Sequence, residues 1–281
     1  MTGVQRATQR SAAQTEQEDS ALPQTLEQAL MLLQQREQEL QTLRCAQDEW
    51  VHAISHDLRA PLRHVLSFGP MIAELLQAQP VAAEELADAR EFLQIMSQSA
   101  RRMGGMLDGL LQLSRANRHV MQWQPVDIGG MLQRLQSDLS SRADVQGRTI
   151  EWQWPVQYPP VRADAQLLEQ ALQAVLCNAV KFTRKVATAR IAVTVELHAD
   201  QGWTLSIADN GSGFDSLRSG KLFGIFQRMH KDSEFEGVGT GLALVRAICR
   251  RHGGEAVIEA RPGEGCVVSL HWPGGLVRGL A

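Results

Sequence analysis

The sequence predicts a protein of two unlike parts, a long helical hairpin followed by an α/β sandwich with a mixed sheet. Three observations predict this multidomain α and α+β fold. Apolar residues keep heptad spacing up to about residue 110, the spacing stops around Trp123-Gln124-Pro125-Val126, and short alternating apolar runs follow, mixed with helical periodicity. A chain of 281 residues is long enough for about two domains that each bury a core.

The composition excludes several classes of protein. The net charge of -3 and the absence of a long basic block give no reason to expect a nucleic-acid partner. No run approaches the ~18 apolar residues of a membrane span, and the N-terminus lacks a secretory pattern, so we expect no membrane span and a cytoplasmic location. The four cysteines show no C-x-x-C spacing and are expected to be reduced thiols.

The N-terminal part divides into a tail and a coiled-coil helix. Residues 1–22 are rich in Gln, Ser, Thr and Ala, which predicts a disordered tail. Residues 23–48 begin a seam of apolar positions spaced by four and three, which is typical of a coiled coil. Its members are Leu26, Leu30, Leu33 and Leu40, followed by Val51, Ile54, Leu58, Val65, Phe68, Ile72 and Leu75. We expect Gly69-Pro70 to kink this helix, because proline lacks an amide donor.

A second seam follows a predicted break near Gln79-Pro80 and completes a hairpin over residues 49–120. It comprises Leu86, Ala89, Leu93, Met96, Ala100, Met103, Leu107 and Leu110. Two helices with one apolar stripe each leave much of that stripe in water, and pairing with an identical hairpin covers it. The sequence therefore predicts a homodimer built on a four-helix bundle.

Residues 121–281 carry the pattern of the α/β sandwich. Alternating runs predict strands at 149–154, 191–197, 203–207, 256–259 and 266–272. Helical spacing predicts helices over 131–145, 164–182 and 240–252. One layer of helices on a mixed sheet satisfies this order of elements.

The segment Ser55-His56-Asp57-Leu58-Arg59-Ala60-Pro61-Leu62 contains a candidate nucleophile. If Ile54 and Leu58 belong to the seam, His56 takes the outermost heptad position and is exposed. A neutral imidazole there can attack phosphorus through one ring nitrogen, while Asp57 accepts a proton or fixes the tautomer. A histidine taken alone is more often part of a solvated face. His52 and His56 on one helical face also suggest a metal site, although no third ligand is evident.

Three later segments have residues suited to a nucleotide. They are Asn178-Ala179-Val180-Lys181, Asp209-Asn210-Gly211-Ser212-Gly213 and Gly237-Val238-Gly239-Thr240-Gly241-Leu242. Glycines before a helix let amide groups face phosphates at the positive end of the helix dipole. Each segment alone also fits a surface lysine or an ordinary turn.

Together with the His56 segment, in this order, these segments resemble the H, N, G1 and G2 boxes of sensor histidine kinases. Phe223-Gly224-Ile225-Phe226 is similar to the F box, and Phe226-Gln227-Arg228-Met229-His230 resembles the phytochrome-type branch. The resemblance covers roughly residues 45–273. It implies that residues 23–48 form a signalling helix, 49–120 a dimerisation and phosphoacceptor domain, and 121–281 a GHKL-type ATP-binding domain.

The resemblance implies a role for each matching residue, with ATP and Mg²⁺ as cofactors. His56 would be the phosphoacceptor, assisted by Asp57. Asn178 would coordinate Mg²⁺ through its amide oxygen, and Asp209 would bind the exocyclic amine of adenine. The remaining residues would contact ATP; they are Lys181, Gly211, Gly213, Arg228, His230, Lys231, Gly237, Gly239, Thr240, Gly241 and Leu242. Among the lid residues, Arg228 is favoured to reach the γ-phosphate.

The implied function is a two-component kinase that phosphorylates His56 from ATP and passes the phosphoryl group to an aspartate of a response regulator receiver domain. No sensory domain is recognisable in the first 45 residues, so we expect the input to arrive through the coiled coil from Leu26 to Leu43, through a separate sensor protein as a further partner, or from a region outside this sequence. Ala60 stands where many relatives have Thr or Asn, which predicts weak phosphatase activity. Ala174 replaces a second asparagine, which predicts reduced metal affinity.

Two other functions fit parts of the sequence. A degenerate kinase could act as a dimeric phosphotransfer scaffold, although Asn178, Asp209 and the three glycines of the G2 segment argue against it. Another ATPase with the same nucleotide fold, of the chaperone or topoisomerase type, would have no need of the His56 hairpin.

Overall fold

The computed structural model describes residues 26–76, 83–199, 202–215, 222–229 and 234–273. The chain divides into two units, residues 1–55 and 56–281, which are described separately. The predicted tail at 1–22 and the predicted break near Gln79-Pro80 lie outside the described residues. Among the residues that are described, no helix combines the length and apolar character needed to cross a bilayer.

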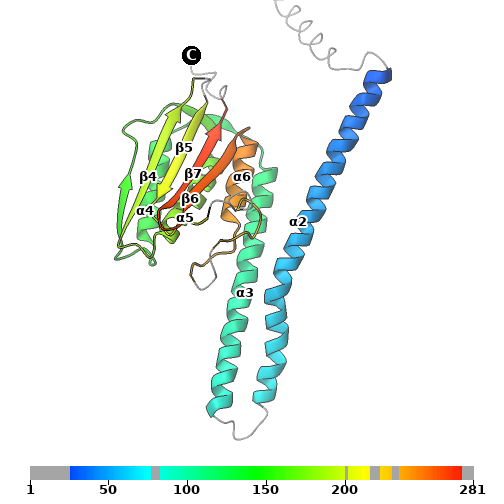
Figure 1. Ribbon diagram of the computed structural model, residues 1–281, viewed down its shortest axis with the longest axis vertical. Coiled ribbons are helices and arrows are strands. Elements are labelled where there is room, and N and C mark those ends of the chain that lie inside the picture. Colours follow the sequence, from blue (N-terminus) through cyan, green and yellow to red (C-terminus); the bar gives the residue numbers. More distant parts are fainter. Residues whose placement is uncertain (1–25, 77–82, 200–201, 216–221, 230–233, 274–281) are drawn as a thin grey trace, which may run out of the picture. The chain divides into compact units, whose positions relative to one another are not determined.

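Helix α2 (Leu26–Leu75) supplies the whole described part of the first unit and continues into the second (Figure 1). Three of its apolar side chains in the first unit, Leu30, Met31 and Leu33, are exposed by 51%, 71% and 64%. An uncovered apolar stripe is what a coiled-coil partner would bury. The coiled coil over 23–48 stays a prediction.

The second unit begins with the helical hairpin. The remainder of α2 packs antiparallel against α3 (Ala83–Arg118), because the Phe68 and Phe92 rings stack at 4.9 Å and His64 Nδ1 lies 3.4 Å from Ser99 Oγ. Acidic residues in the first turn of α3 and basic residues in its last turn match the helix dipole. Helix α2 continues through Pro61 and Pro70, so the kink predicted at Gly69-Pro70 does not end the helix.

A five-stranded mixed sheet follows, in the order β2-β4-β5-β7-β6. Its strands are β2 (Thr149–Gln153), β4 (Thr188–Leu197), β5 (Trp203–Asp209), β6 (Glu255–Arg261) and β7 (Gly265–Trp272). Strand β2 is parallel to β4 and every other pair is antiparallel. The five predicted strands are therefore confirmed, with ends that differ by a few residues.

Three helices cover one face of this sheet and bury the core against it (Figure 1). They are α4 (Ile128–Ser141), α5 (Ala165–Phe182) and α6 (Gly241–Arg251). Helix α4 starts three residues before the predicted position, because the Asp127 carboxylate accepts a hydrogen bond from Gly130 N and caps the helix there. It ends at Ser141, before the predicted end at Val145. The predicted helices at 164–182 and 240–252 are confirmed.

The sequence did not predict a second, small sheet in which β1 (Trp123–Val126) pairs antiparallel with β3 (Val161–Asp164). Each strand has only four residues, and Pro125 interrupts the alternation in β1. The small sheet brings the segment after α3 against the residue that precedes α5.

Asp164 connects the segment that follows α3 to helices α5 and α6. Its carboxylate, in a residue only 1% exposed, accepts hydrogen bonds from Leu167 N at 3.0 Å and Gln122 N at 2.8 Å. The same oxygen that binds Gln122 N lies 2.8 Å from His119 Nε2. Burial acts to raise the pKa of Asp164, but the hydrogen bonds from Gln122, Leu167 and His119 outweigh it and lower that pKa.

The end of α6 completes this connection. Asp164 N donates to His252 Nε2 at 3.1 Å, and His252 Nδ1 lies 2.9 Å from the carbonyl oxygen of Ile248. These two bonds require a neutral His252 with its proton on Nδ1. Arg251 donates to the carbonyl oxygens of Asn117, in the last turn of α3, and of His119, directly after it. The ends of α3, α5 and α6 are therefore fixed to one another around Asp164.

Replacing Asp164 with Ala should lower the free energy of unfolding by about 3 kcal/mol, because it removes a helix cap and leaves buried donors without an acceptor. Urea unfolding followed by circular dichroism measures this change. Asp144→Ala is the matched control, since that carboxylate is exposed and forms an ion pair with the nearby Arg142 at 3.0 Å. Equal losses in the two variants would contradict the role given to Asp164.

Candidate functional site

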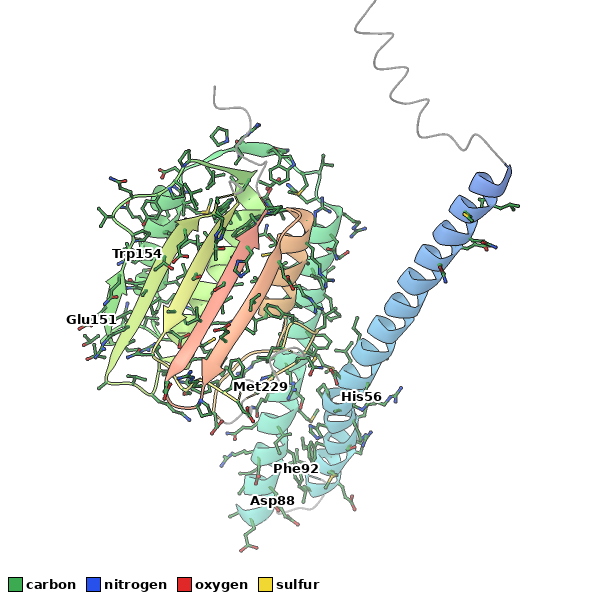
Figure 2. All side chains as sticks on the ribbon, turned by 45° about the horizontal axis from the view of Figure 1, so that its top comes forward. His56, Asp88, Phe92, Glu151, Trp154 and Met229 are labelled. Atoms are coloured by element: carbon green, nitrogen blue, oxygen red, sulfur yellow. The ribbon has the colours of Figure 1, made fainter. Side chains whose placement is uncertain are left out.

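His56 projects into solvent from α2, with 80% of its side chain exposed (Figure 2). Its Nδ1 atom lies 3.1 Å from a carboxylate oxygen of Asp57. An ionised carboxylate only accepts hydrogen bonds, so this contact places the imidazole proton on Nδ1 and leaves the lone pair on Nε2. An exposed Nε2 with a free lone pair is the form of histidine that attacks an electrophile.

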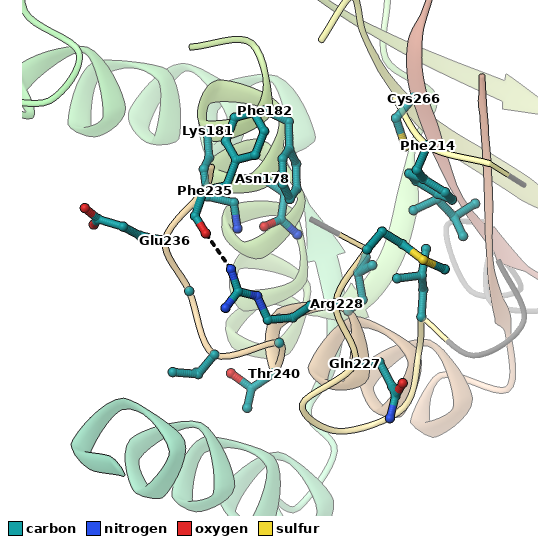
Figure 3. A pocket seen from close by; sticks show the side chains of 18 of the residues that line it. Asn178, Lys181, Phe182, Phe214, Gln227, Arg228, Phe235, Glu236, Thr240 and Cys266 are labelled. Atoms are coloured by element: carbon teal, nitrogen blue, oxygen red, sulfur yellow. Dashed lines mark hydrogen bonds between the residues drawn. The ribbon is translucent and has the colours of Figure 1, made fainter. Parts of the chain in front are cut away.

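A cavity of about 310 Å³ lies elsewhere in the same unit, between α5, the start of α6 and the edge of the sheet (Figure 3). Its polar lining comes from Asn178 and Lys181 of α5, from Arg228, and from the loop that precedes α6. Its apolar lining includes Phe182, Phe214, Leu222, Met229, Phe235, Val238 and Ile258. A partly apolar cavity with cations at one side suits a ligand that has a flat ring and an anionic end.

Two cations lie close together in this cavity. The pKa of Lys181 is lowered to about 8 by burial and by the charge of Arg228. Arg228 donates a hydrogen bond to the Phe235 carbonyl oxygen, drawn as the dashed line in Figure 3, and its pKa is also lowered by burial. Like charges that are partly removed from water repel each other, and a polyphosphate between them would relieve that repulsion.

Asn178 lies beside the first turn of α6. A β-carbon placed on Gly241 would be 3.7 Å from Asn178 Nδ2 and 3.9 Å from the β-carbon of Ala174. The residue before that turn, Thr240, makes no side-chain hydrogen bond that would cap the helix. The first amides of α6 are thus available to an anion, and an amide oxygen stands next to them as a hard ligand for Mg²⁺.

Gly213 and Gly239, which line the cavity, have backbone conformations that favour glycine. Gly213 has φ +55° and leaves no room for a side chain, since a β-carbon would lie 1.8 Å from the Arg261 carbonyl oxygen. Gly239 has φ +77°, and its carbonyl oxygen accepts a hydrogen bond from Phe226 N at 2.9 Å. Phe226 itself has φ +61°, an unfavourable value for a bulky residue. This pairing holds the loop before α6 against the Phe223 to Phe226 segment.

Asp209 ends strand β5 as a partly buried carboxylate next to the cavity. Burial raises its pKa to about 6, although hydrogen bonds from the amides of Gly211 and Cys266 act in the opposite direction. Gly211 N donates to Asp209 Oδ1 at 2.8 Å. Cys266, the partner of Asp209 in β7, lines the cavity. A carboxylate held in this way has a strong tendency to accept a further hydrogen bond from a ligand.

The structure brings most of the predicted nucleotide residues together. Those that line the cavity are Asn178, Lys181, Gly213, Arg228, Gly237, Gly239, Thr240, Gly241 and Leu242. Asp209 and Gly211 adjoin the lining without belonging to it, and His56 and Asp57 lie on α2, away from that lining. The predicted residues His230 and Lys231 lie outside the described residues.

Sequence reasoning missed several lining residues, among them Phe182, Phe214, Phe235, Gln227 and Cys266. Their apolar or neutral side chains carry no motif of their own, although Phe182 and Phe214 directly follow the Lys181 and Gly213 segments. Within the described part of the chain, no group of three or more His, Cys, Asp or Glu side chains is arranged around a metal position.

Replacing Asp209 with Asn should stabilise the protein without ligand. The folded chain holds the Asp209 proton up to a pH of about 6, whereas an unfolded chain releases it near 3.8, so the wild type loses stability as the pH rises through this interval. The loss is about 3 kcal/mol, and the Asn variant avoids it.

Thermal unfolding of both proteins from pH 4 to pH 8 measures this difference. The Asn variant should have the higher Tm at pH 7.5, and it should respond less to added ATP. Curves that stay parallel across the whole pH range would contradict a raised Asp209 pKa.

Two segments of the chain match known protein families. Residues 46–119 match the His Kinase A (phospho-acceptor) domain. Residues 163–275 match the family described as Histidine kinase-, DNA gyrase B-, and HSP90-like ATPase. The first match contains His56 and the second contains every described residue of the cavity lining.

Individual proteins give the same result. Cyanobacterial phytochrome A of Nostoc sp. is 30% identical over 227 residues, which is 81% of this chain but 28% of that protein. The chain therefore spans less than two thirds of this relative. The crystal structure of full-length ShkA in complex with AMPPNP is 26% identical, with a TM-score of 0.52 over 80% of this chain and 45% of that one.

A third match concerns the fold alone. The crystal structure of histidine kinase ThkA in complex with response regulator protein TrrA has a TM-score of 0.60 at 16% identity, covering 91% of this chain and 69% of that one. The hairpin and the mixed sheet thus occur together in a known structure.

Proposed function

Because the chain belongs to the histidine kinases, we propose that it transfers the γ-phosphoryl group of ATP to His56 and then to an aspartate of a response regulator. The observation that carries this proposal is the convergence of Asn178, Lys181, Arg228 and the loop before α6 on one cavity. The AMPPNP in the ShkA complex and the regulator in the ThkA complex support the two partners named here.

Different residues around the cavity bind different parts of ATP. The carboxylate of Asp209 accepts the adenine amine, and the apolar lining packs against the ring. Lys181, Arg228 and the amides at the start of α6 bind the phosphates. Asn178 would hold Mg²⁺, which when bound would neutralise phosphate charge. Ala174, next to Asn178, adds no second ligand, so we expect weaker metal binding than in relatives with asparagine there.

His56 performs the chemical step. Its Nε2 lone pair attacks the γ-phosphorus, the bond from that phosphorus to the bridging oxygen breaks, and ADP leaves with the bonding electrons. Asp57 holds the proton on Nδ1 and stabilises the positive charge that develops on the ring. The phosphorus–nitrogen bond then breaks when an aspartate of the receiver domain attacks, which returns His56 to its neutral form.

We further propose the domain limits and the dimer. Residues 23–48 act as the signalling helix, 49–120 as the dimerisation and phosphoacceptor domain, and 121–281 as the ATP-binding domain. Exposed apolar side chains along the hairpin, including Leu62, Leu66, Leu93, Leu107 and Leu111, support a four-helix bundle with a second copy. The input signal would come from a sensor region or a sensor protein.

The direct test is incorporation of labelled γ-phosphate from Mg·ATP into the purified protein, compared with His56→Gln. The wild type should acquire an acid-labile, base-stable label, and the Gln variant should lose at least about 99% of it because no other nitrogen replaces Nε2. His64→Gln is a matched control on the same helix. Equal labelling of His56→Gln and wild type would refute the assignment.

Ala60 is exposed on α2, one turn after His56, and provides a test of the weak phosphatase activity proposed here. An Ala60→Thr variant should dephosphorylate the phosphorylated receiver domain at least about three-fold faster, because its hydroxyl can orient a water molecule. The measurement is loss of label from the receiver in the presence of ADP. An Ala60→Val variant, similar in shape but without the hydroxyl, should not show this gain. An increase in both variants would contradict the explanation.

A further inference from the structure

Two glycines of α3 contact the loop that carries the phosphate-binding residues. A β-carbon on Gly109 would lie 2.5 Å from both Cγ2 and Oγ1 of Thr240, and one on Gly105 would lie 3.1 Å from Val238 Cγ1. Thr240 and Val238 both line the cavity. Gly109 is buried, and no side chain fits between it and Thr240. These two glycines form a notch in α3, and the loop is seated in it.

The notch lies at the height of His56 along the hairpin. The contact between His64 and Ser99 sets one register of the two antiparallel helices. Eight residues before His64 is His56, and eight residues after Ser99 is Leu107. Both helices rise by about 1.5 Å per residue, so His56 and Leu107 are level.

A second contact gives nearly the same result. The rings of Phe68 on α2 and Phe92 on α3 stack against each other. Figure 2 labels Phe92 and His56 on these two helices. Twelve residues before Phe68 is His56, and twelve residues after Phe92 is Gly104. The two registers place His56 level with residues 104–107, which overlap the notch.

Charge along the same stretch of α3 favours a bound anion. Arg102, one turn before the notch, is close enough to Arg228 for its charge to act, with burial, to lower the pKa of Arg228. Arg228 in turn acts on Lys181. The α3 helix thus adds a third cation near the side of the cavity where the phosphates are proposed to bind, and a polyphosphate there would reduce the repulsion among the three.

We infer that Gly105 and Gly109 are positioning residues, which seat the phosphate-binding loop on α3 at the height of His56 so that the γ-phosphate is delivered to that level of the bundle. This inference rests on the proposed function. The glycines touch the loop rather than the nucleotide, so they act on the transfer step and leave nucleotide affinity to the cavity itself. Misplacement of reacting groups by about 1 Å can lower a reaction rate by about two orders of magnitude. The position of the loop along α3 should therefore affect the rate of transfer to His56.

Three glycine-to-alanine variants of the full chain test the inference. Gly109→Ala introduces the clash with Thr240, Gly105→Ala introduces a milder contact with Val238, and Gly104→Ala meets nothing within 4 Å. All three lie within α3, where alanine favours the helix over glycine by a similar amount. Gly104→Ala is therefore a matched control for helix stability.

The measurement is the initial rate of His56 phosphorylation over a range of ATP concentrations, with melting temperature recorded for each variant. Gly109→Ala should lower the rate at saturating ATP by about ten-fold or more, with the KM for ATP changed by less than about two-fold. Gly105→Ala should give a smaller loss, and Gly104→Ala should match the wild type. No variant should melt below the wild type.

Several results would overturn the inference. Equal rates in Gly104→Ala and Gly109→Ala would show that the notch does not position the loop for transfer. A faster rate in Gly109→Ala would show that the seated loop opposes transfer. A raised KM at unchanged maximal rate would assign Gly109 to nucleotide binding. Absence of label from the wild type would instead count against the proposed function.

Discussion

The buried residue Asp164 joins the segment after α3, the start of α5 and the end of α6 through hydrogen bonds. It caps α5, which carries Asn178 and Lys181, and it binds the segment that leads out of α3. The amide of Asp164 binds His252 at the end of α6, and the other end of α6 follows the phosphate-binding loop. Both walls of the cavity and the end of the hairpin therefore depend on one residue. A buried carboxylate without these hydrogen-bond partners would strongly destabilise the folded chain. Loss of any one partner of Asp164 is therefore costly.

The cavity is electrostatically unfavourable when it lacks a ligand. Burial and mutual repulsion lower the pKa of Lys181, and burial raises the pKa of Asp209. The charged forms of both residues would be more stable in water. In the proposed complex, Lys181 binds the phosphates of the nucleotide and Asp209 binds its adenine amine. Sites that bind charged ligands tightly commonly retain such destabilising groups. The fold around Asp164 supplies the stability that offsets them.

The sequence predicted the architecture well because apolar spacing and glycine motifs are local signals. The heptad seams identify the hairpin helices, and alternation identifies the strands of the five-stranded sheet. The start of α4 was missed because Gly129-Gly130 resembles a loop, whereas the Asp127 cap begins the helix before them. Strands β1 and β3 have too few residues for alternation to be visible.

The sequence predicted the motif residues of the site, but it did not predict the contacts that hold them in place. Asn178, Lys181 and the glycines of the last loop stand in recognisable segments, and the structure places them around one cavity. The link between His119 and Asp164 joins residues 45 positions apart that look ordinary in the sequence. The seating of Thr240 on Gly109 depends on how two distant segments pack, which no local pattern reveals.

The most direct test of the account is to locate the phosphoryl group on the wild-type protein. Brief incubation with Mg·ATP, digestion at alkaline pH and mass spectrometry of the peptides would identify the modified residue. Phosphate is expected on the peptide that contains His56, with fragment ions that place it on the imidazole. Phosphate on another residue, or hydrolysis of ATP without any modified peptide, would contradict it.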